Sequence, residues 1–417
     1  MKRFLSGDEA FAEGVRLAKP QVISAYPITP QTVVVERLSE MVEEGSLKAE
    51  YVHVESEHSA LSCAMGASAT GARTFTATSS QGLLYMAEVL TYAAGGRFPI
   101  VMMNANRATA LPWNIYGDQR DSLALLDHGW IQAYAENNQE ALDLALMAYA
   151  VAEDPAVLTP FMVNLDGFAL THTYETVDVP AEEDADAFLP PYQATNCFDF
   201  EHPKNIGYSA GPDYNRYFKY YEHRDMLGAF EAIDRVEARF AECFGRAYTG
   251  PIEVVNCDDA EVVLVTLGSI AGLARESVAR LCKQGKRVGL LRIRYMRPFP
   301  AKLIAEALAG ATAVGVLEKD ISFGAEGTVF TNVNSALQQA GCMVPTFNFI
   351  GGLGGDDITS AQMDSMFDAL LDTAARRSRD DASTGQGAGL GRVSFLGIDF
   401  PAASLSACGD DCKEGAR

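Results

Sequence analysis

Long hydrophobic runs, paired cysteines and net positive charge are all missing from this chain. No apolar segment approaches the length of a membrane-spanning helix, so the sequence predicts no membrane contact. The first residues, MKRFLSGDEAF, lack the apolar region of a signal peptide, and we therefore expect a cytoplasmic protein. The formal net charge of −22 disfavours nucleic acid and anionic membrane surfaces as partners.

The eight cysteines form no CxxC pair and no CxxCxxCxxxCP run. The sequence thus predicts that no iron–sulfur cluster is held by this chain, and that its thiols are reduced. Cys408 and Cys412 form a CxxxC pattern near the end of the sequence. Two cysteines are too few for a closed metal site unless another chain contributes, and a disordered tail is the favoured interpretation.

The chain of 417 residues, 48% of them hydrophobic, is long enough for two domains. Apolar strands alternate with helices in its first part, which is typical of a doubly wound α/β fold with a parallel sheet covered on both faces. The expected strands are 20–26, 51–54, 73–78, 99–103 and 157–165. The expected helices are 6–18, which opens with a capping box Ser6–Glu9, and 30–43, 57–70, 80–94 and 138–153.

We assign residues 1–257 to the first domain, with an irregular arm at about 170–257 that ends in a helix at 224–244. A linker and a subunit-contact arm remain equally open for this segment. Residues 258–376 form a second, smaller α/β domain. Its expected strands are 261–267, 287–293 and 312–318, and its expected helices are 271–284 and 301–309. The tail, 377–417, is rich in Arg, Asp, Ser and Gly and is interpreted as mobile or as a clasp onto a partner.

The segment Tyr26-Pro27-Ile28-Thr29-Pro30 joins an expected strand to an expected helix. Thr29 falls at the predicted N-cap and Pro30 at the first helical position, where a missing N–H has no cost. The positive end of the helix dipole would then face the carboxyl edge of the sheet and suit a small carboxylate. From spacing alone, a plain helix cap is the favoured interpretation of Thr29.

Other polar residues also follow expected strands. Glu57 opens a helix, Ser80 and Gln81 lie in a strand-to-helix turn, and Arg107 follows the strand 99–103. Dipole pairing and solvation explain such residues in most proteins. For His58 and His172 a structural role is favoured over acid–base chemistry. We expect Asp118, Asp121 and Asp127, which follow in one loop, to face solvent rather than a metal.

Two features of the second domain invite functional interpretations. The turn Gly268-Ser-Ile-Ala-Gly272 lacks both the Lys-Ser/Thr of a P-loop and the third glycine of a dinucleotide fingerprint. Arg292, Arg294 and Arg297 form a basic edge. That edge suits an anionic ligand or an acidic partner, but structural salt bridges are favoured.

Several motifs in order resemble the α subunit of the 2-oxoacid:ferredoxin oxidoreductases, in particular the multi-subunit pyruvate:ferredoxin oxidoreductase or pyruvate synthase. The motifs are YPITP, Glu55-Ser-Glu57-His-Ser-Ala, Thr74 to Gly82, Asn106-Arg107 and Trp113 to Asp118, and the resemblance extends to about residue 375. It implies a first domain of the thiamine-diphosphate pyrimidine-binding type and a second that is transketolase C-terminal-like.

The resemblance also implies roles for individual residues. Glu57 is expected at N1′ of the aminopyrimidine ring of thiamine diphosphate, with Glu55 as second choice. Thr29 and Arg107 are expected to hold the carboxylate of a 2-oxoacid, helped by Tyr26 and Ile28. The same family likeness places Ile115, Ser80 and Gln81 around the cofactor.

The Gly-Asp-Gly that opens the Mg²⁺–diphosphate motif of thiamine enzymes is absent. The chain would therefore hold half of a thiamine site, and the resemblance implies β, γ and δ subunits that bring Mg²⁺, the diphosphate site and [4Fe-4S] clusters. Acidic ferredoxin would dock on those subunits. The implied reaction is the reversible conversion of pyruvate and CoA to acetyl-CoA and CO₂. A sister enzyme for 2-oxoglutarate, a branched 2-oxoacid or oxalate, and a non-catalytic scaffold, remain alternatives, whereas the missing Gly-Asp-Gly disfavours a free-standing transketolase-like enzyme.

Overall fold

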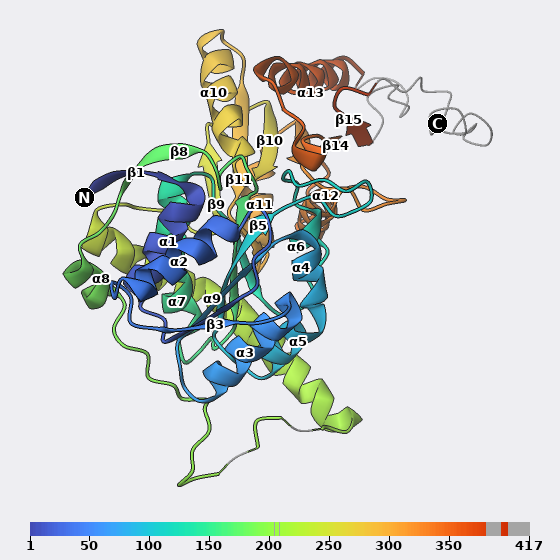
Figure 1. Ribbon diagram of the computed structural model, residues 1–417. Helices are drawn as coiled ribbons and strands as arrows, with labels where there is room; N and C mark the ends of the chain where they lie inside the picture. The colour runs from blue at the N-terminus through green and yellow to red at the C-terminus, as the bar shows by residue number, and fades with distance from the viewer. Residues whose placement is uncertain (204, 208, 381–392, 399–417) are drawn as a thin grey trace.

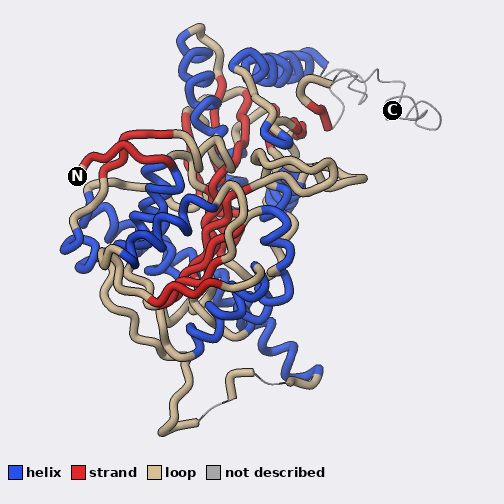
Figure 2. Tube along the Cα trace, viewed as in Figure 1, coloured by secondary structure: helices blue, strands red, loops and turns tan. Residues whose placement is uncertain are grey.

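The computed structural model describes residues 1–203, 205–207, 209–380 and 393–398. Two sheets covered by helices dominate these residues (Figure 1). Figure 2 shows the strands running as a stack through the molecule with helices on either side. In the described ranges, no helix has the length and apolar character needed to cross a membrane.

The larger sheet has seven strands in the order β12-β6-β7-β5-β4-β2-β3, and only β12 runs antiparallel to its neighbour. The strands are β2 (Val22–Ala25), β3 (Glu50–His53), β4 (Thr74–Thr78), β5 (Val101–Asn106), β6 (Ile131–Tyr134), β7 (Phe161–Asp166) and β12 (Tyr295–Arg297). In β5, Val101 and Met103 belong to one apolar cluster and Met102 to another. The sheet is therefore buried on both faces, as its apolar strands predict.

Helices α1, α2, α7, α8 and the second half of α9 cover one face of this sheet, and α3, α4 and α5 cover the other. Their bounds are α1 (Gly7–Ala18), α2 (Thr32–Glu43), α3 (Glu57–Ala69), α4 (Ser80–Tyr85), α5 (Ala87–Gly95), α6 (Arg120–Leu123), α7 (Asn138–Ala152), α8 (Glu182–Phe188) and α9 (Pro212–Phe244). The predicted capping box is confirmed, because Ser6 Oγ accepts from Glu9 N and Ser6 N donates to Glu9 Oε2. A separate antiparallel pair joins β1 (Lys2–Ser6) to β8 (Tyr174–Asp178).

The second sheet has six strands in the order β15-β14-β13-β10-β11-β9, with β9 antiparallel at one edge. Its strands are β9 (Ile252–Val255), β10 (Val262–Leu267), β11 (Val288–Ile293), β13 (Ala313–Glu318), β14 (Thr346–Ile350) and β15 (Val393–Phe395). Helices α11 and α12 pack on one face, and α10 and α13 pack on the other. Their bounds are α10 (Ile270–Lys283), α11 (Ala301–Leu308), α12 (Thr328–Gln339) and α13 (Ser360–Asp380), and a short 3₁₀ helix, η1 (Leu353–Gly355), follows β14.

The chain crosses back from the second sheet to the first at β12, which pairs with β6. Two buried arginines lie at this crossing: Arg292 forms an ion pair with Glu140, and Arg294 with Glu140 (2.8 Å) and Glu237 (2.6 Å). Burial opposes ionisation of Glu140, but the two arginines outweigh it and lower the pKa of Glu140 to about 2. The structural interpretation of these arginines is therefore confirmed.

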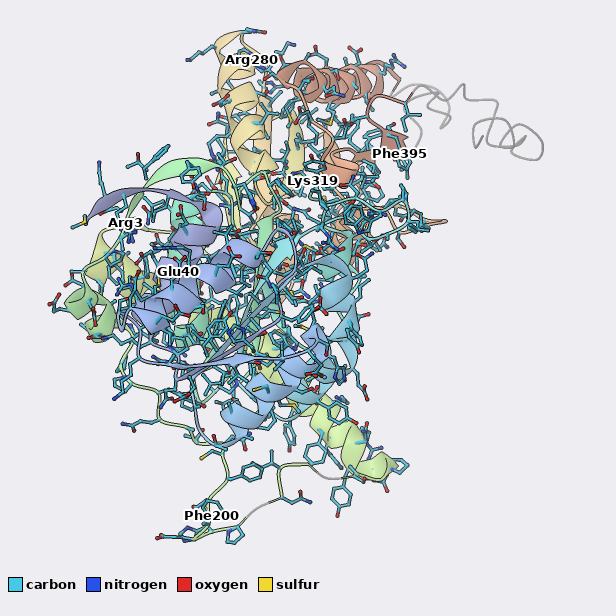
Figure 3. All side chains as sticks on the ribbon, viewed as in Figure 1. Arg3, Glu40, Phe200, Arg280, Lys319 and Phe395 are labelled. Atoms are coloured by element: carbon cyan, nitrogen blue, oxygen red, sulfur yellow. The ribbon has the colours of Figure 1, made fainter. Side chains whose placement is uncertain are left out.

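The arm is more ordered than an irregular segment, because it contains β8, α8, the whole of the long helix α9 and β9. Helix α9 begins at Pro212 rather than near residue 224, with Gly211 as N-cap and proline at the start, where a helix tolerates it. The loop before α9 reaches outward, and Phe200 near its outer end is 98% exposed (Figure 3). A linker and a subunit contact both remain open for this loop.

Other differences are smaller. The helix expected at 80–94 is two helices, α4 and α5, that meet at Met86. The described part of the tail is ordered, because it adds β15 as a parallel edge strand beside β14; the clasp onto a partner stays a prediction. Cys408 and Cys412 lie outside the described residues. The boundary predicted between residues 257 and 258 stays a prediction.

Candidate active site

The predicted site residues gather at the carboxyl edge of the larger sheet. Tyr26, Ile28 and Thr29 follow β2, Glu57 opens α3 after β3, Ser80 and Gln81 follow β4, and Arg107 follows β5. Because β2, β3, β4 and β5 run parallel, these turns all leave the same edge. The sheet thus brings together residues that are far apart in the sequence.

Arg107 is the most deeply buried charged group among them, at 6% exposure. Its Nη1 donates to the Thr29 carbonyl oxygen (2.7 Å), and its Nη2 donates to Gln81 Oε1 (3.2 Å). Burial lowers the pKa of Arg107, while Asp121 and Glu57 act in the opposite direction. In the described part of the chain, no carboxylate lies within ion-pair distance of this guanidinium. Arg107 can therefore bind an external carboxylate.

Thr29 does not cap the following helix, and this prediction is wrong. Helix α2 begins at Thr32, and its N-cap residue Gln31 makes no side-chain cap bond. The Gln31 amide instead donates to Tyr26 O (2.9 Å) and Ala77 O (3.2 Å), which anchors the turn to two strand ends. Thr29 is exposed and meets Arg107 through its backbone, while Tyr26 and Ile28 are half-buried.

Glu57 lies at the first position of α3, after the N-cap Ser56, and is half-buried. It faces Gly82: a Cβ placed on that glycine would lie 2.7 Å from both Glu57 Oε1 and Thr78 Oγ1. Glycine is thus required for this close approach. No hydrogen bond or ion pair holds the Glu57 carboxylate within the described ranges. This carboxylate can accept a hydrogen bond from a ring nitrogen.

The turn after β4 has an unusual backbone. Ser80 is buried and has a φ of +50°, a conformation that few residues other than glycine adopt. Ser80 Oγ lies 2.8 Å from Ala108 O and 2.6 Å from Gln81 Oε1. Gln81 therefore connects Ser80 to Arg107, and the turns after β4 and β5 form one hydrogen-bonded unit.

Some buried polar atoms at this edge have no partner in the described protein. They are Thr78 Oγ1, Ser79 Oγ and Arg107 Nε. Buried polar groups nearly always have a partner, so these atoms fit an edge that binds a polar ligand. Together with the carboxylate of Glu57 they fit the ring side of thiamine diphosphate and the carboxylate of a small acid.

The loop between β5 and α6 reaches the second sheet. Ile115 is half-buried within it, whereas Trp113 is 67% exposed. Asn114 Nδ2 donates to Gly354 O (2.9 Å), and Gly354 N donates to Asp118 Oδ2 (3.1 Å). Hydrogen bonds with Gly354 therefore attach the loop to the segment that follows β14 in the second sheet.

The loop aspartates behave differently from the prediction. Asp127 is exposed as expected, but Asp118 and Asp121 are completely buried. Asp118 forms an ion pair with Arg120, and burial raises the pKa of Asp121 to about 6. Sequence reasoning missed both, since nothing local marks a loop carboxylate as buried. Across the described residues, no group of three or more His, Cys, Asp or Glu side chains is arranged to hold a metal.

The histidines fit structural roles. His58 lies 3.4 Å from Glu88 at the surface, and His172 lies 2.8 Å from Thr171 Oγ1 and packs on Phe168. Burial lowers the pKa of His172. A cleft of about 450 Å³ between the two sheets is lined by Tyr116, Lys319 and neighbouring loops, not by Glu57 or Arg107.

Comparison with known families assigns the chain to a family. The family “Pyruvate flavodoxin/ferredoxin oxidoreductase, thiamine diP-bdg” matches residues 13–238, and “Pyruvate:ferredoxin oxidoreductase core domain II” matches residues 260–363. The chain belongs to the pyruvate flavodoxin/ferredoxin oxidoreductase family. The first match contains all the residues predicted at the site. The predicted family, the oxidoreductase class and a first domain of the thiamine diphosphate-binding type are confirmed.

Curated relatives in this oxidoreductase family cover most of the chain. Pyruvate synthase subunit PorA of Methanothermobacter thermautotrophicus is 48% identical over 87% of this chain and 94% of the relative. PorA of Pyrococcus horikoshii is 47% identical over 87% and 92% of the two chains. Ketoisovalerate oxidoreductase subunit VorA of Pyrococcus abyssi is 45% identical over 86% and 91%. The PorA and VorA names indicate subunits of larger complexes.

A solved structure confirms the fold class. A 2-oxoglutarate:ferredoxin oxidoreductase from Magnetococcus marinus superposes with a TM-score of 0.71 at 21% identity, over 89% of this chain and 65% of that one. At this identity the likeness concerns the fold alone. The roles of Glu57, Thr29 and Arg107 in the oxidoreductase stay predictions.

Proposed function

We propose that this chain is the α subunit of a multi-subunit pyruvate:ferredoxin oxidoreductase, or pyruvate synthase. The observation that carries the proposal is Arg107, a buried guanidinium held by Thr29 and Gln81 that has no carboxylate partner in the described protein. Its location beside Glu57, at the edge of a thiamine-type domain, suits a small 2-oxoacid. The relatives named pyruvate synthase support pyruvate as that acid.

In the forward direction the complex converts pyruvate and CoA to acetyl-CoA and CO₂ and passes the released electrons to ferredoxin. Bound thiamine diphosphate would supply the carbanion equivalent that attacks the keto carbon. Glu57 would accept a hydrogen bond from the aminopyrimidine ring and so hold the ring in its reactive tautomer. Arg107 and the Thr29 segment would orient the substrate carboxylate, which leaves as CO₂, and Ile115 would exclude water.

In this proposal, partner subunits complete the enzyme. This sequence has neither a Gly-Asp-Gly motif nor cysteines at cluster spacing. A β subunit would hold the diphosphate, Mg²⁺ and a [4Fe-4S] cluster, and γ and δ subunits would complete the complex and carry further clusters. Because the charge of −22 repels an acidic ferredoxin, ferredoxin would dock on another subunit. The cytoplasmic location stays a prediction.

A second candidate is the same reaction with a branched 2-oxoacid. The VorA relative of Pyrococcus abyssi, named for ketoisovalerate, is 45% identical, close to the values for the PorA relatives. Pocket size beside Arg107 would separate the two substrates, and that size depends on the partner subunit as well. Substrate kinetics of the assembled complex therefore decide between pyruvate and a branched 2-oxoacid.

The test is 2-oxoacid-dependent reduction of a viologen dye by the natively purified complex, under argon and with CoA. Pyruvate, 2-oxoglutarate, 2-oxoisovalerate and oxalate are compared by kcat/KM. Dominance of pyruvate supports the proposal, and dominance of 2-oxoisovalerate supports the second candidate. No turnover with any acid, in a complex that contains thiamine and clusters, would favour a scaffold.

Glu57→Gln in the assembled complex tests the division of roles. Loss of the ring-activating carboxylate should reduce kcat by about 10²- to 10⁴-fold, the usual size of an acid–base contribution. Glu55→Gln is the matched control, because Glu55 is exposed and bonds to Ser59. Full turnover in Glu57→Gln would remove this residue from the mechanism.

A further inference from the structure

Asp121 lies at the start of the short helix α6 and accepts an unusual number of hydrogen bonds. Its Oδ1 accepts from Asn106 Nδ2 (2.8 Å) and Ser122 N (2.7 Å), and its Oδ2 accepts from Ser80 N (3.0 Å), Arg107 N (3.1 Å) and Asn104 Nδ2 (3.3 Å). All these groups are completely or almost completely buried. The side chain therefore joins the ends of β4, β5 and α6 at one point.

Every partner of Asp121 is an N–H donor. An ionised carboxylate has only acceptors and can satisfy all of them, whereas an amide or a protonated acid would point a donor at a donor. The position thus selects a carboxylate for its chemistry rather than for its size. A solvated loop aspartate, as the sequence suggests, would show no such requirement.

The bonds of Asp121 fix the backbone from which the site residues extend. Ser80 N belongs to the turn with positive φ that carries Gln81, and Arg107 N begins the turn that carries the guanidinium. The side-chain contacts of Ser80 with Gln81 and of Gln81 with Arg107 depend on the relation between these two turns. One carboxylate thus sets the geometry of both.

Asp121 also stabilises the charge of the Arg107 guanidinium without forming a hydrogen bond to it. The two interact electrostatically in favour of the charged guanidinium, but Asp121 binds the Arg107 backbone and not its side chain. A direct carboxylate–guanidinium pair would compete with a substrate carboxylate. The arrangement keeps a positive charge stable in a buried place and leaves its donors available.

We propose that Asp121 is a positioning residue of the 2-oxoacid site: through the backbone N–H groups of Ser80 and Arg107 it holds Gln81 and the guanidinium in the geometry that binds a carboxylate. This inference rests on the proposed function. Asp121 itself does not contact the substrate.

The test is Asp121→Asn in the assembled complex, which keeps the size and removes the acceptor-only character. We expect the KM for the preferred 2-oxoacid to rise about tenfold or more, with a smaller change in kcat, because the turns that carry Gln81 and Arg107 lose the acceptor that holds them. Hydrogen exchange at the amides of Ser80 and Arg107 should accelerate in the same variant. This second readout does not depend on turnover.

Asp143→Asn is the matched control. Asp143 is equally buried, but it bonds to Arg246 (2.6 Å) and Tyr248 (2.7 Å) in the contact between α7 and the segment after α9. This control should lower thermal stability while the KM and the exchange at Ser80 and Arg107 stay unchanged. An equal KM rise in the control would overturn a specific role for Asp121.

If Asp121→Asn does not assemble, Asn106→Ala removes one donor and leaves the carboxylate. It should give a KM rise of about threefold, in line with one net hydrogen bond. A wild-type complex that oxidises 2-oxoacids, with an unchanged KM and unchanged amide protection in the variants, overturns this inference alone. A wild-type complex without turnover overturns the proposed function, and the role of Asp121 with it.

Discussion

The carboxyl edges of the two sheets carry similar charged groups, but they pair them differently. At the edge of the second sheet, Lys319 pairs with Asp166 at the end of β7 in the first sheet (3.3 Å), and Glu318 accepts from Val329 N (2.7 Å) at the start of α12. At the edge of the first sheet, Arg107 has no carboxylate partner in the described chain, and Glu57 has no hydrogen bond there.

We call the edge of the second sheet, where Lys319 and Glu318 have partners within the chain, the structural edge. We call the edge of the first sheet, where Arg107 lacks a carboxylate partner and Glu57 a hydrogen bond among the described residues, the proposed binding edge. Both domains have parallel strands whose turns face the same way, so topology alone predicts a site in each. Where buried charges satisfy one another, as Arg294 and Glu140 do, the result is a joint between domains. Where they stay unpaired, a ligand is expected.

The largest effect should come from breaking the joint. Arg294→Ala leaves Glu140 and Glu237 buried without one of their cationic partners, and it should cost about 3–5 kcal/mol of stability. We expect a lower urea midpoint of the complex, with an unchanged KM for the 2-oxoacid in the fraction that stays folded. The control is Arg287→Ala, an exposed partner of Glu261, which should cost about 0–1 kcal/mol. A raised KM in Arg294→Ala would show that this joint also shapes the site.

The opposite result is expected at the proposed binding edge. Arg107→Ala removes the donors that we propose to bind the substrate carboxylate. It should lower kcat/KM for the 2-oxoacid by about 30- to 1000-fold, equivalent to about 2–4 kcal/mol, mainly through KM. Stability should change little, because no buried carboxylate loses an ion pair. Steady-state kinetics on the assembled complex measure this split. Arg97→Ala, near the other end of β5, removes an ion pair with Asp225 and should not change the KM. A normal KM in Arg107→Ala would remove this residue from the substrate site.

The sequence was sufficient to predict the parallel sheet and the location of Glu57 and Arg107. Apolar strands alternate with helices, and polar residues follow the strands, so the shared edge follows from topology. The predicted cap at Thr29 was wrong because a long-range hydrogen bond replaces a local one: the Gln31 side chain donates to Ala77 O on β4. Local cap rules do not include such partners.

Asp121 and β12 were missed for a related reason. The burial of Asp121 depends on five donors, four of them from β5 and the turns after β4 and β5, and no periodic pattern marks it. Strand β12 has three residues and pairs with β6, more than 150 positions earlier. Sequence periodicity detects elements that are long and locally regular, whereas these features depend on contacts between distant segments.

The smallest expected effect tests whether the buried Glu318 carboxyl, at the edge of the second sheet, is uncharged in the folded protein. Burial raises the pKa of Glu318 to about 8, with Asp320 acting in the same direction, although Val329 N, Phe330 N and Asn348 oppose it. The folded state then holds a proton that the unfolded state releases near its ordinary pKa of 4.5, so stability falls as pH rises from about 4.5 to 8.

Glu318→Gln removes this titration. Its amide group also places a donor where the carboxyl accepts from N–H groups, which lowers stability by a constant amount at every pH. Relative to the wild type, the melting temperature of the variant should rise as pH rises from about 4.5 to 8, and the difference should stay constant below and above this range. Thermal unfolding of the complex at a series of pH values measures the gap. Parallel curves would mean that Glu318 is ionised in the folded state and stabilised by the start of α12. The second edge would then hold a true buried anion, and unpaired charge alone would no longer distinguish the two edges.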